Sequence, residues 1–249
     1  MRPVLTKLTP TRGFSSYLHY ALVVLLPIVV FVLVRLDFVL LAFIVVILAK
    51  WRMFAVRPRF WPANIRANAI DIMVGVSIVI FMHDASSAVV QLIWALVYGF
   101  WLLVIKPRSS VQAVSLQAGL GQFAALSALY VAWDDGPVAG LSIITGLICY
   151  LAARHFIDSF DEAYARLLCY TWGYVAAALA WLLGHWLLYY QFVAQPTLLL
   201  SAIGYGLAAL YYYDHYDRLN TMLKRQFIFI MLAIVLVVLT FSDWGDKVV

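Results

Sequence analysis

The sequence has little charge and little that would fold as a soluble domain. Only 12% of its 249 residues are Asp, Glu, Lys or Arg, and 65% are hydrophobic. Soluble domains carry about 25% charged and about 45–50% apolar residues. This composition excludes a conventional soluble enzyme and predicts a chain that is largely surrounded by lipid.

Cysteines and catalytic motifs are also scarce. The two cysteines, Cys149 and Cys169, both fall within apolar stretches, so we expect small packing residues rather than a disulfide framework. The sequence has no glycine-rich phosphate loop, no Cys-x-x-Cys pair, no His-Glu-x-x-His motif and no nucleophile elbow. No motif names a reaction, and we expect no cofactor.

What the sequence has instead is a series of long apolar stretches. A helix of about 20 apolar residues crosses the hydrocarbon core of a bilayer, and about nine such stretches fill the chain. We predict an all-α fold, a polytopic transmembrane helix bundle that forms a single domain over residues 1–249. The predicted spans are 17–34, 37–54, 67–83, 86–105, 111–133, 137–155, 166–190, 196–213 and 226–242.

The basic residues indicate the orientation of this bundle. With the N-terminus in the cytoplasm, 15 of the 17 Lys and Arg residues fall in cytoplasmic segments, and only Arg35 and Lys247 fall outside. Cytoplasmic loops retain Lys and Arg, so the net charge of +5 requires no nucleic acid to explain it. We predict an N-terminus inside, a C-terminus outside, a first span that is retained rather than cleaved, and a bacterial cytoplasmic membrane as the location.

The spans differ in composition. Those at 17–34, 37–54 and 226–242 are almost purely aliphatic or Phe, so they can face lipid or a partner membrane protein. Spans five to eight carry small residues four positions apart, such as Ser142 and Gly146, which allow helix backbones to approach closely. We expect these four spans at the centre of the bundle.

Two Asp-x-x-Asp pairs are the sharpest chemical signal. The hairpins 136–190 and 195–242 share the pattern Leu-Ala-Ala-x-x-x-x-Asp-x-x-Asp, which suggests a duplicated unit. Pairs that face each other would bind Mg²⁺ and, through it, a diphosphate. The same pattern also fits an ordinary solvated helix, because Arg154 and Asp158 pair four positions apart. The candidate metal ligands are Asp158, Asp161, Asp214 and Asp217.

The layout of the chain is similar to that of the intramembrane prenyltransferases. Those enzymes share the predicted number of spans, the cytoplasmic N-terminus and a pair of Asp-rich cytoplasmic loops. Their motifs are longer, Asn-Asp-x-x-Asp-x-x-x-Asp and Asp-x-x-x-Asp, and the first follows span two, where this chain is basic. The resemblance covers layout and not motif. It implies, as an alternative, an Mg-dependent enzyme acting on a prenyl or lipid diphosphate.

The segment 50–66 interleaves cations with Trp and Phe residues and is broken by Pro58 and Pro62. Such a segment is typical of an interfacial stretch that binds anionic lipid head groups, with ~1 kcal/mol from each cation near the surface. It also fits a simple orientation signal with an aromatic anchor. The candidate head-group ligands are Lys50, Arg52, Arg57, Arg59 and Arg66.

Few polar residues fall inside the predicted spans. Asp71 lies about one turn inside the third span, Gln117 and Gln122 lie in the fifth, and His185 lies near the outer end of the seventh. Ionisable groups within a membrane mark transport pathways, whereas glutamines there also join neighbouring helices by hydrogen bonds. A small-solute transporter would use the glutamines of the fifth span and Asp71.

The sequence favours a non-catalytic membrane component, namely a subunit, a scaffold, or a carrier for lipid or another weakly polar molecule. We expect membrane lipids as partners, and a partner membrane protein along spans one, two and nine. The diphosphate enzyme and the small-solute transporter are the alternatives.

Overall fold

The chain folds into a helical bundle, and 81% of it is helical, which confirms the all-α class. The computed structural model describes residues 14–133, 135–186, 189–190 and 192–243, without the side chains of 14–20, 52, 189 and 190. The helices are α1 (Phe14–Arg35), α2 (Val39–Leu48), α3 (Trp61–Ala67), α4 (Ala69–Asp84), α5 (Ala88–Phe100), α6 (Val111–Ala132), α7 (Val138–Ile157), α8 (Ala165–Gly184), α9 (Gln195–His215) and α10 (Thr221–Phe241). Two short 3₁₀ turns, η1 (Trp51–Met53) and η2 (Pro58–Phe60), precede α3, and a π-helical turn, η3 (Trp101–Ile105), continues α5. The strands β1 (Tyr189–Tyr190) and β2 (Val193–Ala194) pair antiparallel between α8 and α9.

Each predicted span overlaps one helix of ten or more residues. Within the described residues, five helices are long and apolar enough to cross a membrane, namely α5 with η3, α6, α7, α8 and α10. A sixth crossing results if the segment 58–67 and α4 count as one span, although the two are bent by 65°. These helices are compatible with a membrane protein, while nine crossings and their orientation stay a prediction.

Local sequence sets where several helices begin. α5, α6 and α10 each start after a capping residue, whose side chain accepts a hydrogen bond from a backbone N–H in the first turn. The caps are Ser87, Ser110 and Asn220. Between α1 and α2, Asp37 adopts a left-handed conformation with φ of 64°, which allows a tight turn.

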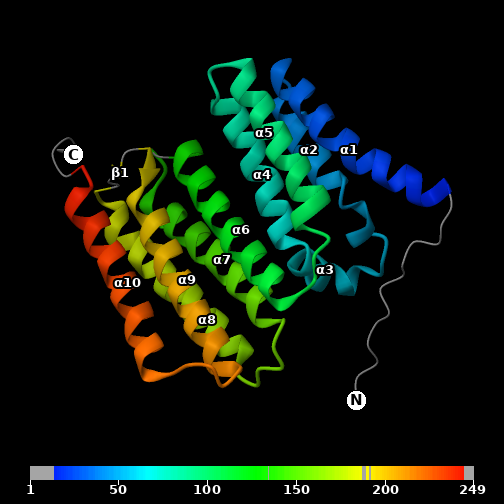
Figure 1. Cartoon of the computed structure of the whole chain (residues 1–249). Helices are drawn as coiled ribbons and strands as arrows, with labels where there is room; N and C mark the ends of the chain where they lie inside the picture. The colour runs from blue at the N-terminus through cyan, green and yellow to red at the C-terminus, as the bar shows by residue number, and fades with distance from the viewer. Residues whose placement is uncertain (1–13, 134, 187–188, 191, 244–249) are drawn as a thin grey trace.

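The helices form two units that meet along α4, α6 and α7. In the first unit, α1, α2, α4 and α5 enclose an apolar core that includes Val46, Val79 and Met82. In the second unit, α6 to α9 enclose another core around Leu126 and Leu200. Figure 1 shows the first unit tilted against the second, with the connections α7–α8 and α9–α10 at the lower end.

Small residues bring α7 and α8 together, as the four-residue spacing predicted. A Cβ atom built on Gly146 would lie 2.9 Å from the carbonyl oxygen of Gly173 and 2.9 Å from the Cβ of Ala177. The two backbones therefore approach closely. The prediction that spans five to eight are central holds for α6 and α7, whose spans are 44% and 50% buried, but α8 is only 22% buried. Its outer face, with Tyr170 and Tyr174, is exposed.

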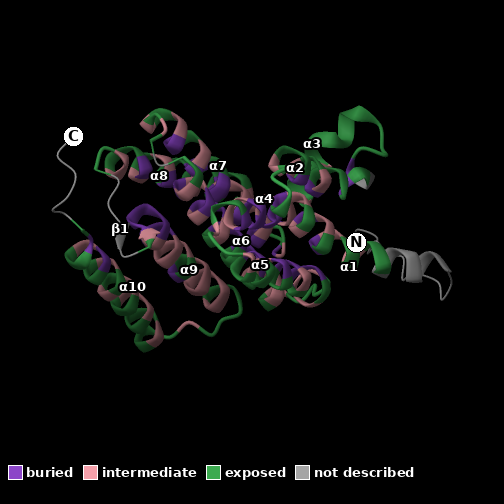
Figure 2. Ribbon diagram, turned by 90° about the horizontal axis from the view of Figure 1, so that it is seen from above, coloured by how far each residue is buried: buried purple, intermediate pink, exposed green. Residues whose placement is uncertain are grey.

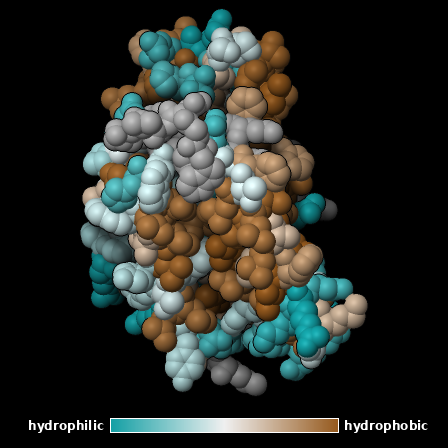
Figure 3. All heavy atoms as spheres, turned by 90° about the vertical axis from the view of Figure 1, so that its left-hand side faces the viewer, coloured by the Kyte–Doolittle hydropathy of each residue, from teal (hydrophilic) through white to brown (hydrophobic). Residues whose placement is uncertain are grey.

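The helix α10 lies at the edge of the bundle, as Figure 2 shows. Only 6% of the residues in its apolar stretch are buried within the protein. Figure 3 views the molecule from this side, and hydrophobic residues fill the middle of that face. This distribution is typical of a helix that faces lipid or another membrane protein.

Candidate functional site

The structure gathers charged side chains at one end of the first unit, around Asp71. Asp71 lies in the first turn of α4, Lys50 follows the end of α2, and Lys106 directly follows η3. Because α4 runs antiparallel to α2 and to α5, the end of each of these helices meets the start of α4. A carboxylate in the first turn also interacts favourably with the helix dipole of α4.

Both lysines bind the same oxygen of Asp71. The Lys50 Nζ lies 2.9 Å and the Lys106 Nζ 2.6 Å from Asp71 Oδ2. The side chains of Lys50 and Asp71 are 8% and 13% exposed, whereas that of Lys106 is 37% exposed. We call these three residues the ion triad. Its two formal positive charges face one formal negative charge, in a site that opens to the surface on the side of Lys106.

The π-helical turn η3 supplies a hydrogen bond to the second oxygen of the Asp71 carboxylate. Trp101, the first residue of η3, donates from Nε1 to Asp71 Oδ1 over 3.1 Å. The backbone N–H of Lys106 donates to the carbonyl oxygen of Trp101 over 2.9 Å, five residues back. Such π turns are rare and occur often at functional sites. Here the turn carries one partner of Asp71 and directly precedes another.

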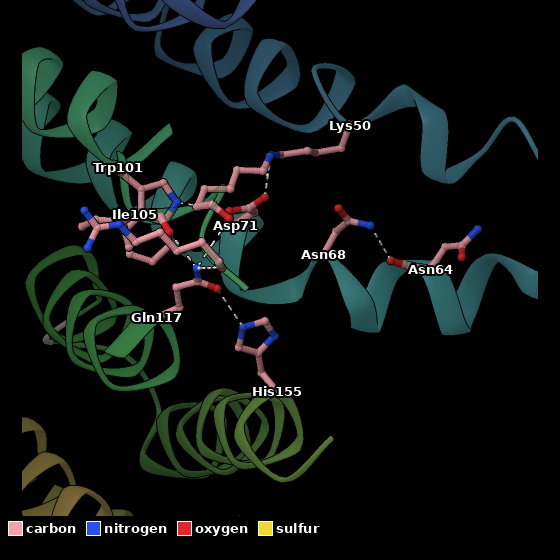
Figure 4. A network of polar contacts seen from close by, with 10 residues as sticks. Lys50, Asn64, Asn68, Asp71, Trp101, Ile105, Gln117 and His155 are labelled. Atoms are coloured by element: carbon pink, nitrogen blue, oxygen red, sulfur yellow. Dashed lines mark hydrogen bonds and ion pairs between the residues drawn. The ribbon is translucent and has the colours of Figure 1, made fainter. Parts of the chain in front are cut away.

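A neutral branch of this network crosses to the second unit, as Figure 4 shows. Gln117 on α6 donates from Nε2 to the carbonyl oxygens of Ile105 and Arg108, over 2.7 and 3.0 Å. Its Oε1 lies 3.3 Å from Nε2 of His155 on α7. Gln117 therefore satisfies carbonyl groups that the end of η3 leaves without helical partners, and it links both units.

Burial makes the ion triad sensitive to the loss of any partner. Moving a charge out of water costs several kcal/mol unless an opposite charge and hydrogen bonds replace the water. Lys50 is the most buried of the three, and Asp71 is its charged partner. The triad therefore fixes the ends of α2 and of α5 with η3 against α4.

The predicted head-group segment divides into a buried and an exposed part. Lys50 belongs to the ion triad, while Arg57, Arg59 and Arg66 are exposed. Arg59 lies over the ring of Phe60 at 4.5 Å, a cation–π contact. The side chain of Arg52, the remaining candidate, lies outside the described residues. Binding of head groups by this segment stays a prediction.

The two Asp-x-x-Asp pairs lie at neighbouring helix ends. Phe160, within the first pair, has its ring centroid 4.9 Å from that of His215, within the second. All four aspartates are exposed, and Asp158 pairs with Arg154 at 3.1 Å, as the charge spacing predicted. Within the part of the chain that the structure describes, no group of three or more His, Cys, Asp or Glu residues could hold a metal ion. A metal site at Asp158, Asp161, Asp214 and Asp217 stays a prediction.

Glu162 joins these two helix ends. Its carboxylate accepts hydrogen bonds from the backbone N–H of Tyr164 over 3.0 Å and from the hydroxyl of Tyr211 over 2.7 Å. The Tyr164 bond first, and the Tyr211 bond second, lower the pKa of the Glu162 carboxyl, since both favour its charged form.

The other predicted intramembrane polar residues, Gln122 and His185, lie near backbone carbonyl oxygens. Gln122 donates from Nε2 to the carbonyl oxygen of Leu200 over 3.2 Å, a buried bond between α6 and α9. His185 follows the last residue of α8 and is exposed, with Nδ1 2.8 Å from the carbonyl oxygen of Trp181. The arrangement of Gln122 agrees with an interhelical role.

Sequence reasoning missed Lys106, Trp101 and His155 as members of the site. Lys106 entered the prediction only as a cytoplasmic charge, and Trp101 and His155 carried no motif. The one available signal was that Lys50, Asp71 and Lys106 all fall near the same predicted end of neighbouring spans.

The chain matches no protein-family model, and no curated protein or solved structure shows significant similarity to it.

Proposed function

We propose that this chain is a polytopic integral membrane protein with a non-catalytic role, as a subunit or scaffold that contacts a partner membrane protein along α10. α1 and α2 also expose aliphatic residues, such as Leu25 and Leu40, but α10 has the least contact with its own chain among the five apolar helices.

The exposure of α10 is the main support for this role. Its apolar stretch is the most hydrophobic of the five helices and has the lowest buried share, 6%. One stripe contacts α9, where the sulfur of Met231 approaches Gly206, while Phe229 and Leu236 are 72% and 63% exposed. A helix that adds so little to the core of its own chain serves contacts outside that chain.

The contacts of the ion triad support a structural role for the Asp71 carboxylate. Both oxygens of Asp71 are engaged by donors of the same chain, namely Lys50, Lys106 and Trp101. A carboxylate held in this way joins helices and is poorly suited to release and bind protons in a transport cycle. This arrangement favours a scaffold over a small-solute transporter.

The proposed topology places the basic end of the bundle in the cytoplasm. Lys and Arg residues outnumber acidic ones in the segment 50–66 and around 106–108, which matches cytoplasmic retention of cations. Accessibility labelling of single cysteines tests this orientation. Cysteines placed at Arg57 and Arg108 should react only from the cytoplasmic side, and one placed at Asp84 only from the other. Labelling of all three from one side would contradict it.

Site-specific photo-crosslinking along α10 tests the partner. We expect crosslinkers at Phe229 and Leu236 to give an adduct with the same membrane protein in native membranes. We expect a crosslinker at Met231, which faces α9, to react within the chain. Protein adducts that recur every three to four positions would support the proposal, because this is the period of one helix face. Adducts with lipid alone at every exposed position would overturn it.

A further inference from the structure

The ion triad contains more hydrogen-bond donors than acceptors. Each lysine ammonium carries three N–H donors, and among the described residues each has one carboxylate acceptor, the shared Asp71 Oδ2. Gly75 lies one turn after Asp71 on α4, and the Tyr98 hydroxyl approaches it closely. A Cβ atom built on Gly75 would lie 2.9 Å from that hydroxyl oxygen. That hydroxyl is fully buried and has no hydrogen-bond partner among the described residues.

The site also has an excess of positive charge. Two ammonium groups face one carboxylate, so the described residues leave the triad with one more formal positive charge than negative charge. The buried ammonium of Lys50 shares its counter-charge with Lys106, and this sharing weakens the compensation of a charge that burial has removed from water. An anion that reaches the ammonium groups from the side of Lys106, whose side chain is 37% exposed, would compensate both the charge and the unused donors.

We propose that the ion triad is an anion site that binds a phosphate group. A tetrahedral phosphate presents several oxygens, which can accept from Lys50 and Lys106 simultaneously, while a halide presents one centre. The proposal rests on the membrane location in the proposed function, because a lipid head group reaches the site only from the membrane interface. The phosphate comes either from an anionic lipid or from solution, and the chemistry at the lysines is the same.

The surroundings favour the lipid as the source. The exposed Arg57, Arg59 and Arg66 lie in the segment directly after Lys50, together with the exposed aromatic rings of Trp51 and Trp61. Indole rings and cations together are typical of the head-group region of a bilayer. The segment 58–67 meets α4 at 65°, so it runs in a different direction from the helix that carries Asp71.

Asp71 has opposite roles in a structural triad and in an anion site. In a purely structural triad, replacing Asp71 by Asn removes the carboxylate that both lysines contact among the described residues. In an anion site it also removes a negative charge that repels the phosphate, and both lysines become free to bind it. Removal of one charge at this distance changes the affinity by on the order of tenfold or more.

Native mass spectrometry of the full chain tests the proposal, with phosphatidylcholine nanodiscs that contain or lack phosphatidylglycerol, and with inorganic phosphate in a separate arm. We expect retention of phosphatidylglycerol by the wild-type chain. We expect on the order of tenfold weaker binding for Lys106→Gln, recovery for Lys106→Arg and tighter binding for Asp71→Asn. Lys224→Gln removes an exposed charge at the start of α10 and should leave binding unchanged.

Three results would overturn the proposal: no retention of lipid or phosphate, equal losses for Lys106→Gln and Lys224→Gln, or weaker binding by a folded Asp71→Asn chain. If Asp71→Asn does not fold, the proposal is still tested by comparing the binding of Lys106→Gln, Lys106→Arg and Lys224→Gln. Binding of phosphatidylglycerol that excess inorganic phosphate does not displace identifies lipid as the source. Binding of inorganic phosphate without lipid preference identifies a solution anion. The crosslinking result on α10 is independent of each of these outcomes, so the two proposals can fail separately.

Discussion

Different kinds of contact hold the helices together within each of the two units of the bundle. In the first, the ends of α2 and of α5 with η3 are fixed to α4 by the charges of the ion triad. In the second, α7 and α8 touch backbone to backbone at Gly146 and Gly173, and a buried neutral amide, Gln122 on α6, donates to the backbone of α9. Charge is thus used at a helix end, while close packing and neutral hydrogen bonds operate along the helices.

The difference follows from the cost of burying charge. Near the end of a helix, water and head groups lower that cost, and Lys106 keeps 37% of its side chain exposed. Between helices that lie in hydrocarbon, the hydrophobic effect does not favour association, so shape and neutral hydrogen bonds decide. Four substitutions test this comparison, and each is measured as the free energy of unfolding, or its thermal midpoint, for the full chain in detergent.

Asp71→Ala is expected to have the largest effect. It leaves Lys50 buried without its acceptor, so we expect a loss of about 3 kcal/mol, the lower end of the range for breaking a buried pair, since Lys106 remains partly solvated. The matched control is Asp158→Ala. The Asp158 side chain is 54% exposed and pairs with Arg154 at the surface, so its loss should stay below about 1 kcal/mol. Equal losses for the two variants would show that the triad is not buried as described.

Gly146→Ala should destabilise the second unit by about 2 kcal/mol, because the added methyl group would overlap the carbonyl oxygen of Gly173. Gly119→Ala is the control on α6, where a Cβ meets nothing within 4 Å. There we expect a gain of up to about 1 kcal/mol from helix propensity. The prediction is therefore a difference in sign, and a loss at both positions would contradict it.

Gln122→Leu should lower the free energy of unfolding by about 1 kcal/mol, because it removes the donor to the Leu200 carbonyl oxygen. The comparison variant is Gln112→Leu. Gln112 is exposed and lies 3.4 Å from the Tyr212 hydroxyl, so we expect no measurable change. A loss at Gln122 as large as that for Asp71→Ala would remove the contrast between neutral and charged contacts.

The smallest effect is a pH dependence at the α7–α8 connection. The lowered pKa of Glu162 means that its contribution is present above the ordinary carboxyl pKa of 4.5 and is lost as pH falls through the lower, folded-state value. Tyr211→Phe removes one of the two hydrogen bonds that lower this pKa. We expect the thermal midpoints of wild type and Tyr211→Phe to differ slightly at neutral pH and to converge on acidification. A difference that grows at low pH would have the wrong sign.

The sequence predicted the helices well because their signal is local. The span predicted at 111–133 corresponds to α6 at Val111–Ala132, and the span at 137–155 to α7 at Val138–Ile157. Each apolar stretch carries its own length and hydropathy, which requires no knowledge of its neighbours. The Arg154–Asp158 pair was predictable for the same reason, since a helix fixes that spacing.

Only the tertiary structure decided which polar residues meet. Lys50 and Lys106 both reach Asp71, although they stand far apart in the sequence and resemble the other basic loop residues there. Likewise, Phe160 packs against His215, yet the neighbouring aspartates form no metal cluster among the described residues. Hydropathy along the chain determines which segments enter lipid, but the packing of helices determines which side chains share a site, because contact between distant residues depends on how the helices are rotated and tilted against one another.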